Sequence, residues 1–180
     1  MNGTRRRSAD LGPKKPARSL LLSLQSGAGA HALPATRAQL RRWVLAALEC
    51  DAELTLRFVG RTEAVALNRA FRSKAYAPDV LTFVYPGEGS PMAPLGSAAR
   101  FAASTAAPVR LHADIVLCMP VLRAQARASG IALEQRLAHL VIHGVLHAQG
   151  WDHETHDQAQ IMQERETALL RRFRIPDPWA

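Results

Sequence analysis

The sequence predicts an α+β fold in a single domain, with a small mixed β-sheet packed by helices. The chain has 180 residues, the length of one domain with room for one sizeable core. Hydrophobic residues make up 48% of the chain and charged residues 21%, as in an ordinary globular protein, which excludes wholesale disorder and fibrous repeats. Segments with strand and helix periodicity follow one another without a strict strand–helix–strand alternation, so the sheet is expected to be mixed.

The first three predicted elements are a strand, a helix and a strand. Residues 20–24 form a short apolar run, which predicts a strand. Residues 36–50 place apolar side chains at helical spacing. Residues 54–60 alternate apolar and polar side chains, as a strand does.

A second helix is expected to end at about Arg72. Thr62 is its predicted N-cap, because a threonine hydroxyl can accept a hydrogen bond from the first helical turn. Its predicted apolar face consists of Ala64, Leu67 and Phe71, which are spaced three and four residues apart.

Two further strands are predicted at residues 80–85 and 112–117, on either side of an atypical stretch. That stretch, residues 86–110, is rich in Pro, Gly, Ala and Ser. A structureless connection of this length is unusual inside a compact domain. It is therefore expected to be a mobile loop inserted between the two strands.

The C-terminal part of the chain is predicted to be helical. Pro120 begins a helix that extends to about Ser129. Residues 133–149 form a long helix, and residues 156–173 form the last one. Gly150 stands where a residue in the left-handed conformation would end the long helix.

The N-terminal residues 1–18 are predicted to be a disordered basic tail. They contain six cations and one acidic residue, with few apolar side chains and two prolines. The whole chain has a formal charge of +8, which favours polyanionic partners. Two interpretations of the tail stay open: a solvated segment without a partner, or a non-specific electrostatic contact with nucleic acid.

Cysteine content and hydropathy favour a cytoplasmic location. Cys50 and Cys118 lie far apart in the sequence, which excludes a disulfide scaffold and a thiolate zinc site and suits a reducing compartment. No run of 18 apolar residues is present, so no contact with a membrane interior is expected. Prolines and lysines at 13–16 interrupt the apolar segment that a signal peptide needs, so none is expected.

The most informative segment is the end of the long helix. His143 and His147 are four residues apart, so both imidazoles project from one face and can share a metal ion. Gly150 can turn the chain back, which brings His153 to a third coordination position. Three histidines leave one of four tetrahedral positions open, the arrangement of a catalytic zinc site. Asp152 is a candidate to accept a hydrogen bond from a ligand imidazole.

The same histidine spacing occurs in the H-E-x-x-H-x-x-G-x-x-H motif of metzincin proteases, but one position differs. The residue after the first histidine, the general base of those enzymes, is here Gly144, which cannot transfer a proton. The metal ligands are therefore expected without the peptidase base. His139, four residues before His143 on the same face, could support a ligand or compete with one, but it is interpreted as a packed or exposed histidine. His156 and Asp157 are interpreted as the start of the last helix.

Residues 143–153 resemble the H-G-x-L-H-x-x-G-[YW]-D-H signature of the YbeY family of bacterial endoribonucleases, also called rRNA maturation factors. Further segments resemble the family's motifs: L-N-x-x-[YF]-R at 67–72, T-x-V-L-S-F at 79–83, L-G-D-I-x-I at 112–116, and M-x-x-x-E at Met162 and Glu166. The similarity extends from about Ser19 to the C-terminus.

This resemblance implies a zinc-dependent endoribonuclease directed to single-stranded RNA, with one Zn²⁺ per chain. It implies a role in small-subunit rRNA 3′-end processing and ribosome quality control in the cytoplasm, with rRNA and the small ribosomal subunit as partners. It also implies that Arg72 faces the metal cleft. Departures from the family pattern, among them Pro78 for Thr and Ala113 for Gly, leave the ligands and Arg72 in place.

Arg72 is the predicted catalytic residue and substrate clamp. Cleavage of a phosphodiester develops negative charge, and a guanidinium suits that charge because it binds phosphate bidentately and does not deprotonate. Lys74 is a further candidate phosphate contact. Without the resemblance, Arg72 would be interpreted as a surface arginine at a helix C-terminus. Two other functions stay open. One is a non-catalytic RNA-binding or ribosome-assembly factor, in which the metal only joins the last helix to the long one, and the other is a metalloprotease.

Overall fold

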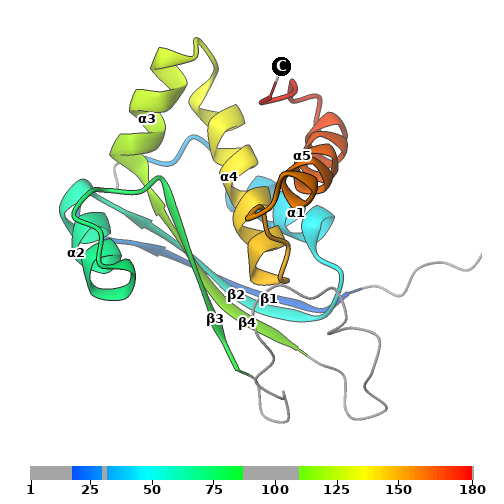
Figure 1. The fold of residues 1–180 in the computed structure, drawn as a ribbon, viewed down its shortest axis with the longest axis horizontal. Coiled ribbons are helices and arrows are strands. Elements are labelled where there is room, and N and C mark those ends of the chain that lie inside the picture. The colour runs from blue at the N-terminus through cyan, green and yellow to red at the C-terminus, as the bar shows by residue number, and fades with distance from the viewer. Residues whose placement is uncertain (1–17, 30–31, 87–109, 180) are drawn as a thin grey trace, which may run out of the picture.

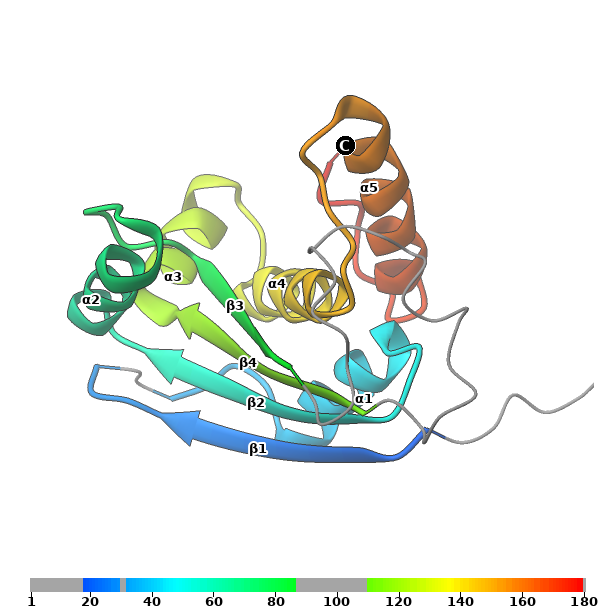
Figure 2. The ribbon, with the colours of Figure 1, turned by 60° about the horizontal axis from the view of Figure 1, so that its bottom comes forward.

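The computed structural model describes residues 18–29, 32–86 and 110–179. In these residues the chain forms a four-stranded mixed sheet covered by helices, which confirms the predicted α+β fold (Figure 1, Figure 2). The predicted basic tail and the predicted loop insertion lie outside the described residues, apart from Arg18, Pro86 and Arg110 at their ends.

Every strand and helix predicted from the sequence is present, with ends displaced by no more than three residues. In chain order the elements are β1 (Leu20–Ser26), α1 (Arg37–Ala47), β2 (Ala52–Val59), α2 (Arg61–Arg72), β3 (Val80–Tyr85), β4 (Leu111–Cys118), α3 (Met119–Ala128), α4 (Leu133–Ala148) and α5 (His156–Arg171). Among the described residues, no helix combines the length and the apolar character that crossing a bilayer requires.

The sheet has the strand order β1-β2-β4-β3, so the strand that comes last in the sequence lies inside the sheet. The pairs β1–β2 and β2–β4 are parallel, and β3 runs antiparallel to β4. The register pairs both Leu56 of β2 and Thr82 of β3 with Ile115 of β4. The sheet is therefore mixed, as the irregular alternation of elements predicts.

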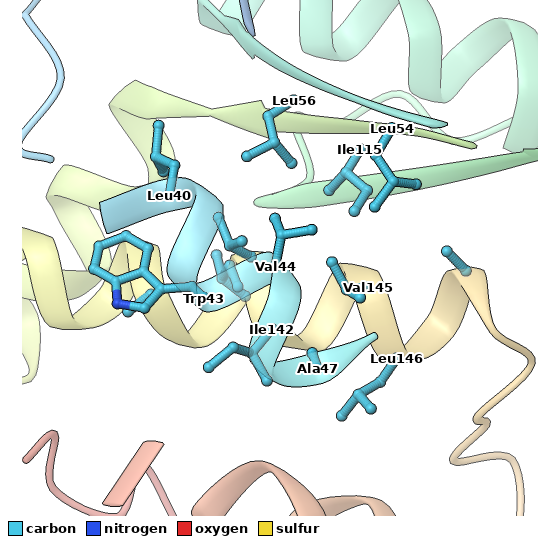
Figure 3. Packing of buried hydrophobic residues seen from close by; sticks show 14 of the residues in the cluster. Leu40, Trp43, Val44, Ala47, Leu54, Leu56, Ile115, Ile142, Val145 and Leu146 are labelled. Carbon is cyan, nitrogen blue, oxygen red and sulfur yellow. The ribbon is translucent and has the colours of Figure 1, made fainter. Parts of the chain in front are cut away.

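The main core lies between one face of the sheet and helices α1 and α4. Leu54, Leu56 and Ile115 from the strands meet Val44 of α1 and Val145 of α4 there (Figure 3). All five side chains are buried, and burial of each stabilises the fold by about 1.5–3 kcal/mol. This packing fixes α4 against the sheet.

The opposite face of the sheet is partly covered by α2. Successive strand residues point to opposite faces, so Val116 and Cys118 lie on the other side from Ile115. They form a second, smaller cluster with Leu81 of β3 and Ala64 of α2. The helices α2 and α4 therefore cover different faces of the β3–β4 pair.

The start of α2 differs from the sequence prediction. Gly60, and not Thr62, is the N-cap residue, and Thr62 lies inside the first turn. A Cβ at Gly60 would lie 2.6 Å from the carbonyl oxygen of Ala28, so the close approach of two backbone segments requires a glycine there. Because β2 ends at Val59, the helix begins directly after this glycine and before the threonine could cap it.

The apolar face of α2 also differs from the prediction at its last turn. Phe71 is 66% exposed, and its ring packs edge-on against Phe83 with a centroid distance of 4.9 Å. The buried residue near this end is Asn68, whose Nδ2 donates a hydrogen bond to the carbonyl oxygen of Tyr76 at 2.9 Å. Ala64, Leu67 and Phe71 therefore point toward the second cluster as predicted, but Phe71 stays mostly exposed at its edge.

The C-terminal end of α4 is a Schellman motif, and Gly150 has the predicted left-handed conformation with φ +88°. Its N–H donates to the carbonyl of His147 at 3.0 Å, and the N–H of Trp151 donates to the carbonyl of Leu146 at 3.2 Å. The chain reverses at this turn and leads to α5, which packs against α4 (Figure 2).

We expect Gly150→Ala to lower the free energy of unfolding by about 1 kcal/mol, because an alanine is strained in the left-handed region. A Cβ added at Gly150 meets no atom within 4 Å beyond its chain neighbours, so no clash contributes. Gly130 is a matched control, since it has φ +63° and equally open surroundings. Urea denaturation should show similar losses for Gly150→Ala and Gly130→Ala, and unchanged midpoints in both would contradict the backbone argument.

Candidate metal centre

Three histidine rings meet at the C-terminal end of α4. His143 and His147 stand about one turn apart on the helix, and their ring centroids are 4.4 Å apart. The ring of His153, beyond the turn, lies 4.9 Å from that of His147 and 5.9 Å from that of His143. One nitrogen of each ring lies within 4.8 Å of the other two. The fold thus brings together the three residues that the sequence spacing singles out.

The chemistry and placement of these donors fit a metal ion with an open coordination position. His153 is exposed, and His143 and His147 are half-buried, so the group faces solvent on one side. Three imidazole nitrogens within 4.8 Å of one another can converge on one ion, and three protein ligands leave one position of a four-coordinate zinc ion open. Imidazole ligands suit zinc and other late transition metals.

A buried carboxylate holds the ring of His143. Glu166 projects from α5, and its side chain is 1% exposed. Its Oε1 accepts a hydrogen bond from Nδ1 of His143 at 2.6 Å. With the proton on Nδ1, the lone pair of Nε2 is the one that remains for a metal ion.

Asp152, the carboxylate that sequence reasoning favours for this task, bonds to the backbone: its Oδ1 accepts from the N–H of His153 at 2.8 Å. In the sequence, Glu166 stands out through the M-x-x-x-E similarity alone. The fold supplies the physical reason for its role: Met162 and Glu166, four residues apart on α5, are both buried, and a buried carboxylate requires hydrogen-bonded partners.

His139, one turn before His143, belongs to the same network and is a packed histidine. Arg136 contacts its Nδ1 at 3.2 Å and can only donate, so the proton of His139 is on Nε2, which donates to Oε2 of Glu166 at 3.3 Å. Arg136 in turn pairs with Asp79 at 3.2 Å. His139, His143 and Glu166 are close enough to hold an ion, but hydrogen bonds already join their facing atoms.

Burial and hydrogen bonding set the protonation of the centre. Burial by itself raises the pKa of Glu166, but hydrogen bonds from His139 and His143 outweigh it and lower that pKa to about 2. Burial, followed by the charges of His143 and His153, lowers the pKa of His147 to about 4. At neutral pH, Glu166 is therefore an anion and His147 a neutral imidazole, which is the form that binds metals.

Gly144 faces the sheet. A Cβ at this position would lie 2.7 Å from Cγ2 of Ile115 and 3.4 Å from Oγ1 of Thr82. Ile115 is fully buried and branched at Cβ, so it cannot move aside at low cost. The position that holds the general base in metzincins thus faces the core in this protein and has no room for a side chain.

Arg72 and Lys74 stand at the C-terminal end of α2. Arg72 is the last residue of α2, Lys74 follows it, and both are exposed. Ser73 between them is left-handed with φ 56°, and the N–H of Lys74 donates to the carbonyl of Asn68 at 3.4 Å. Helices α2 and α4 cover different faces of the sheet, and among the described residues no hydrogen bond or ion pair joins either cation to the three histidines.

Comparisons with known proteins point to one family. A family model described as "Endoribonuclease YbeY" matches residues 31–174. A protein of Thiobacillus denitrificans named "Endoribonuclease YbeY" is 48% identical over 160 residues, which cover 89% of this chain and 96% of that protein. A protein of Methylibium petroleiphilum with the same name is 44% identical over 168 residues, which cover 93% and 99% of the two chains. The solution structure of a Thermotoga maritima protein has a TM-score of 0.47 and 22% identity over 86% of this chain and 92% of that one.

We expect Glu166→Ala to lower the free energy of unfolding of the metal-free protein by about 3 kcal/mol, because it leaves buried donors of His139 and His143 without an acceptor. Glu164 is a matched control on the same helix, since it is exposed and hydrogen-bonds Gln160 one turn away. Glu164→Ala should change stability by less than about 0.5 kcal/mol. Urea denaturation with chelator present measures both, and equal effects of the two substitutions would refute the role of the buried carboxylate.

Proposed function

Since the chain belongs to the YbeY family of endoribonucleases, we propose that it is a zinc-dependent enzyme that cleaves single-stranded RNA in the maturation of the small-subunit rRNA 3′ end and in ribosome quality control. The observation that carries the proposal is the convergence of three imidazoles, one of them fixed by a buried carboxylate, on a side of α4 that faces solvent. RNA, rRNA and the small ribosomal subunit are the proposed partners, and the cytoplasm is the proposed location.

In this proposal His143, His147 and His153 hold the ion, one per chain. When bound, a zinc ion would supply Lewis-acid stabilisation of charge on a phosphoryl oxygen. The protein's own part is to set the ligands in the correct form. Glu166 keeps the proton of His143 on Nδ1, and burial keeps His147 neutral.

Arg72 is the proposed contact for the scissile phosphate. Its guanidinium is exposed at the end of α2, where a planar fork of donors can bind a phosphate bidentately. Asn68 supports this end of the helix by tying it to the loop at Tyr76. Lys74 adds a point charge two residues further along, which suits a flanking phosphate.

A second candidate function is a non-catalytic RNA-binding or ribosome-assembly factor. It is favoured by Gly144, whose packing against Ile115 leaves no general base at that position. In that case the ion would serve to join α4 to the segment that carries His153. The same packing disfavours a metalloprotease. RNA cleavage by the purified protein, with and without chelator, decides between the two RNA-related functions.

We expect His143→Ala, His147→Ala and His153→Ala each to lose the metal and to melt at a lower temperature than the metal-loaded protein, because metal binding contributes directly to folding. His156→Ala is the control, since His156 is exposed at the start of α5 and outside the centre. Elemental analysis should give about one zinc per chain for the wild type and the control. Full occupancy in any two of the three variants would rule out this ligand set.

We expect Arg72→Ala to keep the fold and the metal but to lose RNA cleavage by more than tenfold, because a bidentate charged contact to phosphate contributes more than about 1.4 kcal/mol. Arg72→Lys should restore little, since an ammonium lacks the planar fork. Arg61→Ala, at the other end of α2, is the matched control. Wild-type cleavage by Arg72→Ala would reject the role, and loss of zinc would assign Arg72 to the structure of the centre.

A further inference from the structure

The chain beyond α5 turns back toward the metal centre. Arg174 has φ +59°, and the N–H of Ile175 donates to the carbonyl of Leu170 at 3.2 Å, as in a Schellman motif. Ile175 then packs against the main core. The residues that follow, 175–179, are called here the C-terminal segment, and they lie beyond the region that the family model matches.

The C-terminal segment is fastened to α5 by Asp177. One carboxylate oxygen of Asp177 accepts hydrogen bonds from Oγ1 of Thr167 and from the N–H of Trp179, both at 3.0 Å. Thr167 is buried on α5 next to Glu166. Pro176 and Pro178 restrict the backbone on both sides of Asp177. The segment is thus held in one conformation close to the buried carboxylate.

Trp179 completes the hydrogen bonding of that carboxylate. Its Nε1 donates to Oε2 of Glu166 at 3.2 Å, the oxygen that also accepts from Nε2 of His139 at 3.3 Å. The indole ring meets the ring of His139 edge-on, with a centroid distance of 5.4 Å. Donors from α4 and from the C-terminal segment therefore fix the same oxygen from two directions.

Because Oε2 of Glu166 is fixed, the direction of Oε1 is fixed as well. A carboxylate is planar, so when Oε2 is held by two donors, Oε1 points in one direction, toward Nδ1 of His143. With one of these donors removed, the carboxylate gains rotational freedom, and the ring of His143 loses its fixed orientation and tautomer.

We infer that Trp179 is a positioning residue for the metal centre: through Glu166 it orients the imidazole of His143 and so strengthens metal binding. This inference rests on the proposed metal centre. It assigns a role to the C-terminal segment, which supplies no ligand itself.

The test is Trp179→Phe in the full-length protein, which keeps an aromatic ring beside His139 and removes the donor to Glu166. We expect zinc affinity, measured by competition with a chromophoric chelator, to fall about tenfold, at the lower end of the range for outer partners of metal ligands. Trp43→Phe is the control, because Trp43 is a tryptophan of α1 that is buried in the main apolar core. It should lower the melting temperature and leave zinc affinity unchanged.

A second variant tests the same chain of contacts at a different residue. Asp177→Ala releases the C-terminal segment without touching Glu166, and it should weaken zinc binding by a similar factor. Because both substitutions break the same chain of contacts, the double variant should bind zinc no more weakly than the weaker single variant. In nitrogen-15 spectra of the metal-free proteins, both single variants should also show a smaller fraction of His143 with its proton on Nδ1 than the wild type does.

The outcomes separate the inference from the function on which it rests. A wild-type protein that binds no zinc refutes the metal centre. A wild type that binds zinc, together with unchanged affinity and an unchanged His143 tautomer in both variants, overturns the role of Trp179. Loss of stability without loss of affinity also overturns it, since that result describes a purely structural contact.

Discussion

The close contact between α4 and the sheet at Gly144 determines where the chemistry of this protein lies. The missing Cβ lets the helix approach Ile115 and Thr82, so the orientation of α4 about its own axis is fixed. Each residue advances about 100° around a helix, which puts His147 and His143 about 60° and 100° from the sheet-facing direction, on one flank. His139 continues this flank, and α5 packs against it. A side chain at position 144 would separate the helix from the sheet and displace His139, His143 and His147.

The flank of α4 that faces α5 carries a chain of polar contacts that is half-buried at one end and buried at the other. It runs from Asp79 before β3, through Arg136 and His139, to Glu166 and His143. Buried polar groups are costly unless each has a partner, and here the anion of Glu166 is matched by two donors from α4 and one from the C-terminal segment. The network therefore connects the loop before β3 to His143 near the C-terminal end of α4, although no residue of that loop belongs to the candidate ligands.

The sequence was sufficient where a single local rule decides the outcome, and insufficient where two distant segments meet. His143 and His147 follow from helix geometry, and the turn at Gly150 brings His153 to them, so their arrangement could be predicted. Thr62 was wrong as a cap because the approach of Ala28 to Gly60, about thirty residues apart, is not visible in a local pattern. Glu166 lies on another helix from His143, and neighbouring Asp152 was the nearer carboxylate in sequence.

The strand order has a consequence for synthesis of the chain. β4 lies between β2 and β3, yet it follows both in the sequence and comes after the long connection from Pro86 to Arg110. During translation, β2 has only β1 beside it, and β3 has no partner until Leu111–Cys118 have left the ribosome. The antiparallel β3–β4 pair and the parallel β2–β4 pair then form around the same late strand, so completion of the sheet is a single, non-local event. Until that moment the nascent chain exposes strand edges, which is the interval in which it is most open to aggregation.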